Sequence, residues 1–302
     1  MPLTEHVAIV SMAREVPTRD LLQVAAAVQK QVTRDFTPLW GIPATVDAFE
    51  DLASVPSDYR PVVLFSDLGE LSSRLEYVLG AQPAETLIKA LEADEVAGIH
   101  LTAITRQPFS LASVEGAWTV TVSHETLEML ADPYGNRLVA AAHPLDPALR
   151  VCYLLEVCDP CLSMYYTVNG VLVSDFYTPR YFDPVRIPSV RYSFTGALGH
   201  PREILEGGYL SWIDPRDSSL YQLHAGEQPI LLSGLAELKR SRDPLRTVVD
   251  SNPRTPRPGL GPLRKAPSVV AGEGANVGLL EASLGTAQVT SDALLSLTRE
   301  FG

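Results

Sequence analysis

The pattern of apolar and polar residues divides the first part of the chain into predicted strands and helices. Residues 5–12 form a continuous apolar run, which predicts a buried strand. Residues 18–36 place their apolar side chains on one stripe at helical spacing, which predicts a helix with Thr18 as its N-cap. Further apolar runs predict strands at 42–48, 60–66, 97–104 and 108–114, with a helical stretch near 84–93.

Residues 120–136, VTVSHETLEMLADPYGN, combine an apolar β-branched run with a group of ionisable side chains. The first residues read as strand-like, and Ser123 is a predicted cap for a helix that begins at His124. Pro133 disfavours helical geometry at Asp132, so the helix is expected to end there.

The second half of the chain is predicted to be richer in strands. Strands are expected at 138–143 and 151–157, and a hairpin at 165–178 turns at Asn169-Gly170. Residues 1–236 are therefore expected to form the main domain. Residues 237–267, with eight Lys or Arg and several prolines, predict a basic linker, followed by a tail at 268–302 with a short helix near 291–300.

Composition narrows the classes of function. A formal net charge of −12 argues against a general nucleic-acid-binding or anionic-membrane-binding surface, because such partners would be repelled. The N-terminus lacks a secretory layout, and no run of about 18 apolar residues occurs. Three cysteines are too few for a disulfide framework. We therefore expect a cytoplasmic protein with no membrane partner.

His124 and Glu128 are the strongest candidates for chemistry. Residues four apart on a helix lie on one face, so both side chains can reach a common point. Imidazole nitrogen and carboxylate oxygen are zinc donors, which predicts binding of zinc or another divalent cation. Glu125 would stand beside water held by the ion and act as the general base, and the expected reaction is hydrolysis of an amide.

Three carboxylates compete to be the third ligand. Glu156 lies 28 residues beyond Glu128, on a later element, and is preferred. Asp132 is the second choice, as a ligand or as a residue that orients His124. Asp159 is the third.

Other ionisable residues receive more ordinary interpretations. Cys158 and Cys161 have a metal or redox spacing but no second pair, so they are expected to be buried thiols. Tyr177, Tyr181 and Asp175 could line a cleft, and the Tyr177 hydroxyl could donate to a developing oxyanion. Packing or surface roles are expected for the remaining isolated histidines, His143, His200 and His224.

The motifs SHETLEMLADPYGN, LLEVCDP, VNGVLVSDFYTPRYFDP and GGYLSW together resemble a group of bacterial proteins that look like zincin-type metallopeptidases. In that group His-Glu-x-x-Glu replaces His-Glu-x-x-His, and the likeness spans about residues 5 to 215. It implies an α+β fold with an N-terminal helix, a mixed sheet, a metal-binding helix and an irregular C-terminal part. It also implies that an edge strand, here residues 107–113, pairs with an extended peptide. Glu128 makes the ion less electrophilic and shifts the preference toward harder ions.

Two functions follow as hypotheses. The first is a zinc-dependent metallopeptidase or amide hydrolase that acts on a peptide or protein substrate. The second is a non-catalytic metal-binding or peptide-binding protein that keeps the same fold. For the basic linker, we expect either an acidic partner or a role in covering the cleft.

Overall fold

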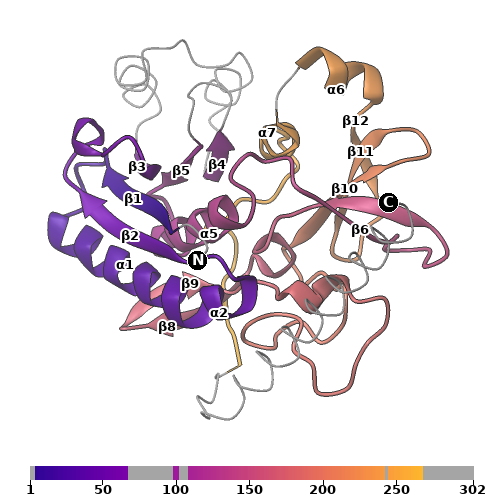
Figure 1. Ribbon diagram of the computed structural model, residues 1–302, viewed down its shortest axis with the longest axis horizontal. Helices are drawn as coiled ribbons and strands as arrows, with labels where there is room; N and C mark the ends of the chain where they lie inside the picture. The colour runs from indigo at the N-terminus through magenta and orange to yellow at the C-terminus, as the bar shows by residue number, and fades with distance from the viewer. Residues whose placement is uncertain (1–3, 67–97, 102–107, 242–243, 268–302) are drawn as a thin grey trace, which may run out of the picture.

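Three β-sheets and a small number of helices make up the described part of the chain (Figure 1). The structure, a computed structural model, describes residues 4–66, 98–101, 108–241 and 244–267. The mixed α+β class expected from the sequence is confirmed. The stretches expected to be helical near 84–93 and 291–300 lie outside the described residues. Within the described part of the chain, no helix combines the length and apolar character that crossing a membrane needs.

The first sheet has the strand order β2-β1-β3-β5-β4. Its four parallel strands are β1 (Glu5–Ser11), β2 (Ala44–Phe49), β3 (Arg60–Phe65) and β5 (Phe109–Ser113). The fifth strand, β4 (Gly98–Leu101), runs antiparallel to β5 at the edge. The expectation that residues 107–113 form the edge strand is wrong, because β5 lies between β3 and β4.

The helix that the apolar stripe predicts is present, and it connects β1 to the parallel strand β2. Helix α1 (Thr18–Gln31) continues through a π-helical turn (Val32–Phe36) into α2 (Thr37–Trp40). It stops at Gly41, whose φ of 68° is left-handed. The N-cap is Pro17 and makes no side-chain cap bond, so Thr18 is the first helical residue and not the cap.

Helix α5 (Trp118–Ala131) carries the His-Glu motif and begins six residues earlier than expected. The β-branched run before His124 is helical, because every residue from Val120 to Ala131 is buried and packing overrides the local strand preference. Figure 1 shows α5 in the middle of the molecule, beside α1 and the first sheet.

Ser123 is an interior residue of α5 and not its cap. Its hydroxyl donates to Gln31 Oε1 of α1 at 2.7 Å and accepts the Ser174 N–H at 3.0 Å. Gln31 Nε2 donates in turn to the Ser174 carbonyl at 2.8 Å. These buried bonds connect α5, α1 and strand β9 (Val171–Ser174), so they fix the rotation of α5.

The second and third sheets hold the loops that face α5. The second sheet has the order β12-β11-β10-β7-β6 and is antiparallel throughout. Its strands are β6 (Leu138–Ala142), β7 (Arg150–Leu154), β10 (Tyr209–Asp214), β11 (Ser219–His224) and β12 (Ile230–Ser233). Of these strands, the sequence analysis predicts β6 and β7.

The predicted hairpin is confirmed. Strands β8 (Met164–Val168) and β9 (Val171–Ser174) pair antiparallel and turn at Asn169 and Gly170. Both turn residues have positive φ, 51° and 84°, as an Asn-Gly turn requires. Short 3₁₀ turns occur at Leu52–Ser54, Asp159–Cys161 and Pro179–Phe182.

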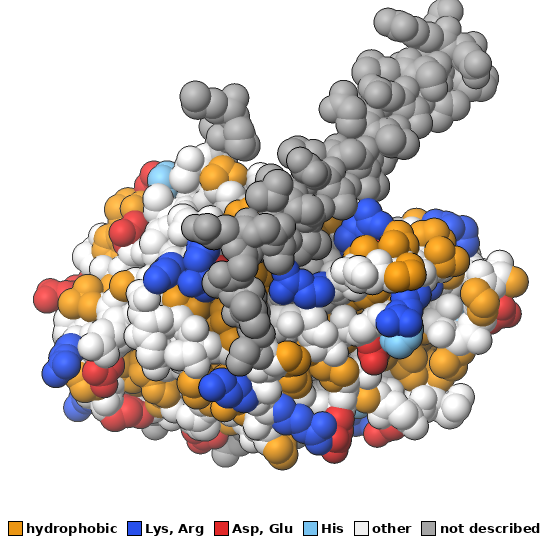
Figure 2. All heavy atoms as spheres, turned by 90° about the horizontal axis from the view of Figure 1, so that it is seen from below, with side chains coloured by type: hydrophobic (Ala, Val, Ile, Leu, Met, Phe, Trp, Pro, Cys, Tyr) orange, Lys and Arg blue, Asp and Glu red, His pale blue; other side chains and the backbone are white. Residues whose placement is uncertain are grey.

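The segment expected to be a basic linker is folded onto the rest of the protein. It contains α6 (Leu235–Ser241), α7 (Leu245–Asp250) and β13 (Arg264–Lys265), which pairs with β8. We call residues 244–266 the strap. On the visible part of the face in Figure 2, Lys and Arg side chains are scattered among hydrophobic, acidic and uncharged side chains. The folded strap differs from the basic linker that the charges and prolines of this segment predict.

Gly208 offers a test of how the second sheet supports the Asp159–Cys161 turn. A Cβ at Gly208 would lie 2.6 Å from the carbonyl oxygens of Asp159 and Pro160. We expect Gly208→Ala to lower the free energy of unfolding by about 1–3 kcal/mol, measured by urea denaturation. Gly234→Ala is the matched control, because a Cβ there meets nothing within 4 Å. Equal stability of the two variants would contradict this packing.

Candidate metal centre

Two elements bring the ionisable side chains together. His124, Glu125 and Glu128 lie on α5 and are each 1% exposed. The chain after β7 places the second set opposite them, and this set consists of Glu156, Cys158 and Asp159. The Cys158 N–H donates to Glu128 Oε1 at 2.9 Å, which joins the turn to the helix.

His124 Nε2 lies between two carboxylates. It is 3.3 Å from Glu128 Oε2 and 3.2 Å from Asp159 Oδ1. Neither contact has hydrogen-bond geometry, so both ring nitrogens of His124 lack a hydrogen-bond partner among the described residues. The two carboxylates stabilise a protonated imidazole at this position, and a metal ion between the same donors would take the place of that proton.

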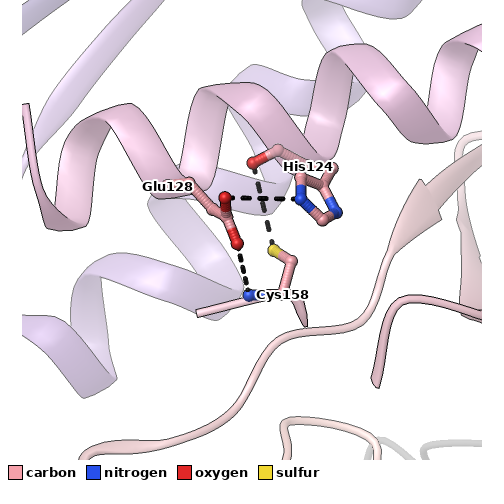
Figure 3. Close-up of side chains that lie close together, drawn as sticks. All are labelled: His124, Glu128 and Cys158. Atoms are coloured by element: carbon pink, nitrogen blue, oxygen red, sulfur yellow. Dashed lines mark hydrogen bonds and ion pairs between the residues drawn. The ribbon is translucent and has the colours of Figure 1, made fainter. Parts of the chain in front are cut away.

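A compact group of possible ligands is formed by His124, Glu128 and Cys158, whose donor atoms all lie within 4.8 Å of one another. Figure 3 shows the two α5 side chains directed toward each other, with Cys158 on the facing loop. The Cys158 thiol also lies 3.9 Å from the His124 carbonyl oxygen. These residues could hold a metal ion.

The structure changes the order of preference among the three carboxylates that are candidates for the third ligand. Asp159, the last choice from sequence, is the one next to His124 Nε2. Glu156, the first choice, is also buried, but among the described residues its ion pair is with Arg246 and not with His124, at 3.9 Å between Oε1 and Nε. Asp132 is engaged elsewhere, because its Oδ2 accepts the Arg137 N–H at 2.7 Å.

Sequence analysis did not identify the role of Arg246, a buried cation contributed by α7. Its Nη1 contacts Glu128 Oε2, and its Nε lies 3.2 Å from Asp250 Oδ2. The guanidinium is only 4% exposed. The signal was present in the sequence, since Pro244 precedes the apolar stretch LRTVVD, in which an Arg and an Asp are four residues apart.

The charges in this cluster do not balance. Five carboxyl groups are at most 2% exposed, namely Glu125, Glu128, Glu156, Asp159 and Asp250. Among the described residues of the cluster they face one guanidinium, that of Arg246, and one imidazole, that of His124. Buried charges of one sign need a compensating cation or must bind protons.

The pKa values show this imbalance. Burial raises the pKa of Glu125 to about 8, and it raises the pKa of Glu156 well above its usual value. Burial also opposes ionisation of Glu128, but Arg246 and His124 outweigh it and hold the pKa of Glu128 at about 2. Burial would lower the pKa of His124, yet Glu128 and Asp159 hold it well above 6.5. A divalent cation here would favour the ionised form of every carboxylate.

Tyr177 lies at the same cluster. Its side chain is fully buried, and its hydroxyl has no hydrogen-bond partner among the described residues. Burial raises the pKa of this hydroxyl, and the nearby Tyr181, Glu128 and Glu156 raise it further. The group is therefore a neutral hydrogen-bond donor close to the carboxylates.

The remaining candidates have ordinary partners. Asp175 accepts from the Thr195 hydroxyl at 2.5 Å, and the Tyr181 hydroxyl donates to the Glu203 carbonyl at 2.7 Å. The three isolated histidines lie outside the cluster, as expected: His143 contacts Trp212, His200 lies near Glu203, and His224 bonds Gln222. Burial raises the pKa of both Cys158 and Cys161, so each is a thiol.

No protein-family model, curated protein or solved structure matches this chain. The chemistry of the cluster is therefore inferred from its own geometry.

The position of Asp159 generates a prediction about metal binding. We expect Asp159→Asn to weaken binding of zinc by at least about tenfold, because it removes a charged donor beside His124. Asp132→Asn is the control, and it should leave the affinity close to that of the wild-type protein. Competition with a chromophoric chelator measures both. Equal losses in the two variants would contradict the assignment of Asp159.

The alternative sulfur donor has its own test. With cobalt as the probe, a Cys158 thiolate ligand would give a sulfur-to-metal charge-transfer band, whereas oxygen and nitrogen ligands would not. We expect the band to be absent and Cys158→Ser to leave the cobalt spectrum unchanged. A band that disappears in Cys158→Ser would identify Cys158 as a ligand.

Proposed function

We propose that this protein is a zinc-dependent amide hydrolase of the metallopeptidase type, with His124, Glu128 and Asp159 as the metal ligands. The observation that carries the proposal is the position of His124 Nε2 between two carboxylate oxygens, at 3.3 and 3.2 Å, without a hydrogen bond to either. Two donors that each lie about 2.0–2.1 Å from a tetrahedral zinc are separated by about 3.3–3.4 Å. The two separations that involve His124 Nε2 agree with that value. The described donors that all lie within 4.8 Å of one another are those of His124, Glu128 and Cys158, so Asp159 Oδ1 satisfies the distance to His124 alone.

The chemistry of the donors also favours zinc. One nitrogen and two carboxylate oxygens would leave a coordination position for water, as in catalytic zinc sites. We favour Asp159 over Cys158 as the third donor because both Asp159 oxygens are buried without a hydrogen bond among the described residues. Two anionic ligands reduce the electrophilicity of the ion, so a harder divalent cation is the alternative to zinc.

The neighbouring side chains have distinct roles in this proposal. A bound zinc ion supplies the acidification of water and the polarisation of the substrate carbonyl. Glu125 accepts the proton of the attacking water and passes it to the leaving amine. The Tyr177 hydroxyl donates a hydrogen bond to the developing oxyanion. Glu128 Oε1 keeps its orientation because it accepts the Cys158 N–H.

The order of the elements supports the resemblance to zincin-type metallopeptidases. A helix, a mixed sheet with an antiparallel edge strand and a buried metal helix follow one another along the chain. Under this proposal β4, and not residues 107–113, is the edge strand that would pair with an extended peptide.

A second candidate is a non-catalytic protein in which the metal ion stabilises the fold. The burial of the whole cluster favours it, because each of His124, Glu125 and Glu128 is only 1% exposed. In this case the ion would compensate buried carboxylates without meeting a substrate.

Glu125→Gln distinguishes the two functions. If the protein is a hydrolase, the variant should retain stoichiometric zinc, shown by elemental analysis, and lose turnover by about 100-fold or more, because it cannot accept the proton. Turnover is measured as cleavage of a mixture of short peptides, followed by mass spectrometry. A wild-type protein that binds zinc and cleaves none of the peptides would favour the second candidate.

A further inference from the structure

The strap contacts the metal helix at both of its ends. Beyond the C-terminal end of α5, the Arg246 N–H donates to the Gly135 carbonyl at 3.0 Å. At the N-terminal end, the Ala117 N–H donates to the Gly259 carbonyl at 3.0 Å. The strap therefore runs along the helix that carries the candidate ligands, and its own cation, Arg246, enters the cluster between these two attachments.

Arg246 and a metal ion would use the same oxygen atom. Glu128 Oε2 faces His124 Nε2, and it is also the atom that Arg246 Nη1 contacts. A guanidinium and a divalent cation repel each other, and the repulsion is strong in a buried site where the effective dielectric constant is low. Simultaneous occupation of Glu128 by both cations is therefore unfavourable.

We propose that Arg246 of the strap competes with the metal ion for Glu128, so that the strap closes the metal centre when it is empty and loosens when the ion binds. This inference rests on the proposed function. It also accounts for the burial of the cluster, since displacement of Arg246 gives the ligands and Glu125 a route to substrate. By thermodynamic linkage, whatever weakens the Arg246 contact must strengthen metal binding, and metal binding must weaken the contact.

The packing of α7 fits a segment that moves separately from the main core. Val249 is its fully buried apolar residue, and it belongs to a small cluster with Leu154, Leu162, Tyr209 and Leu220. The main core around α1 and α5 is a different cluster. A small satellite cluster opens locally at a lower free energy than a domain core.

The outer part of the strap is anchored to α5 and to the second sheet: Thr255 is buried against Gln222, and the Pro258 carbonyl accepts the Thr121 hydroxyl at 3.0 Å. The segment that can loosen is therefore α7. Residues 253–264 border a cavity of about 480 Å³, with Leu162, Ser163, Glu206 and Gly207 on the opposite side. The ion pairs of this outer part, Arg254 with Glu227 and Arg264 with Glu206, join exposed side chains. Such pairs contribute little to stability, so the hydrogen bonds to α5, β11 and β8 hold the outer part of the strap in place.

Substitution of Arg246 tests the competition directly. We expect Arg246→Gln to bind zinc roughly 5- to 150-fold more tightly than the wild-type protein, because the competing charge is gone. Arg246→Lys keeps the charge and should bind with nearly wild-type affinity. Arg254→Gln is the matched control on the same strap and should also leave the affinity unchanged. The Arg254 side chain is exposed, and it pairs with Glu227 at 3.7 Å and not with a residue of the cluster. Chelator competition measures all four proteins.

Hydrogen exchange of the full-length wild-type chain supplies the reciprocal measurement without any substitution. Amides of residues 245–251 should exchange at least about fivefold faster with saturating zinc than after chelation, whereas those of β1 should not change. Two results would overturn the proposed competition between Arg246 and the metal ion. One is a zinc affinity of Arg246→Gln that is equal to or weaker than that of the wild-type protein. The other is exchange of the strap amides that is no faster with zinc than without it. If Arg246→Gln does not fold, the exchange measurement alone decides.

A wild-type protein that binds no zinc, cobalt or other divalent cation removes the proposed function as well, whereas zinc binding with an unresponsive strap removes this inference only.

Discussion

The excess of buried carboxyl groups around α5 is the constraint on which the rest of the structure depends. Glu125 and Glu128 come from the helix, and Glu156 and Asp159 come from the chain after β7. Removing such groups from water is costly, and a protein can accept this only through proton binding, ion pairs or a bound cation. In this structure the first two mechanisms operate together, since the pKa of Glu125 is raised to about 8 while Glu128 stays ionised beside Arg246 and His124.

The fold holds the two sides of this cluster with different strength. On the helix side, bonds among Ser123, Gln31 and Ser174 fix the rotation of α5 within the largest core. On the loop side, the Asp159–Cys161 turn is held by the Cys158 N–H to Glu128 and by backbone packing against Gly208. Arg246 comes instead from a short helix in a small separate cluster. The side chains of α5 and of the Asp159–Cys161 turn are therefore more firmly positioned than the arginine that compensates their charge.

Much of the local structure could be predicted from the sequence because short-range patterns decide it. The apolar run of β1, the stripe of α1 and the Asn169-Gly170 hairpin each depend on neighbours within a few residues. The start of α5 could not be predicted in this way. Its β-branched residues favour a strand locally, but burial on all sides makes them helical. The segment of the strap was misread for a related reason, since its charges and prolines resemble a linker until partners are present.

The sequence by itself determined that His124 and Glu128 share one face of a helix, because the helical repeat is a local property of the chain. Only the tertiary structure decided which carboxylate meets them and which cation compensates them. Asp159 reaches His124 while Asp132 bonds to its own turn, and Arg246 arrives from 118 positions beyond Glu128. The contacts of Asp159 and Arg246 with the α5 side chains depend on how a turn, a sheet and a distant helix pack together. The spacing of residues along the chain does not fix the distances between these elements.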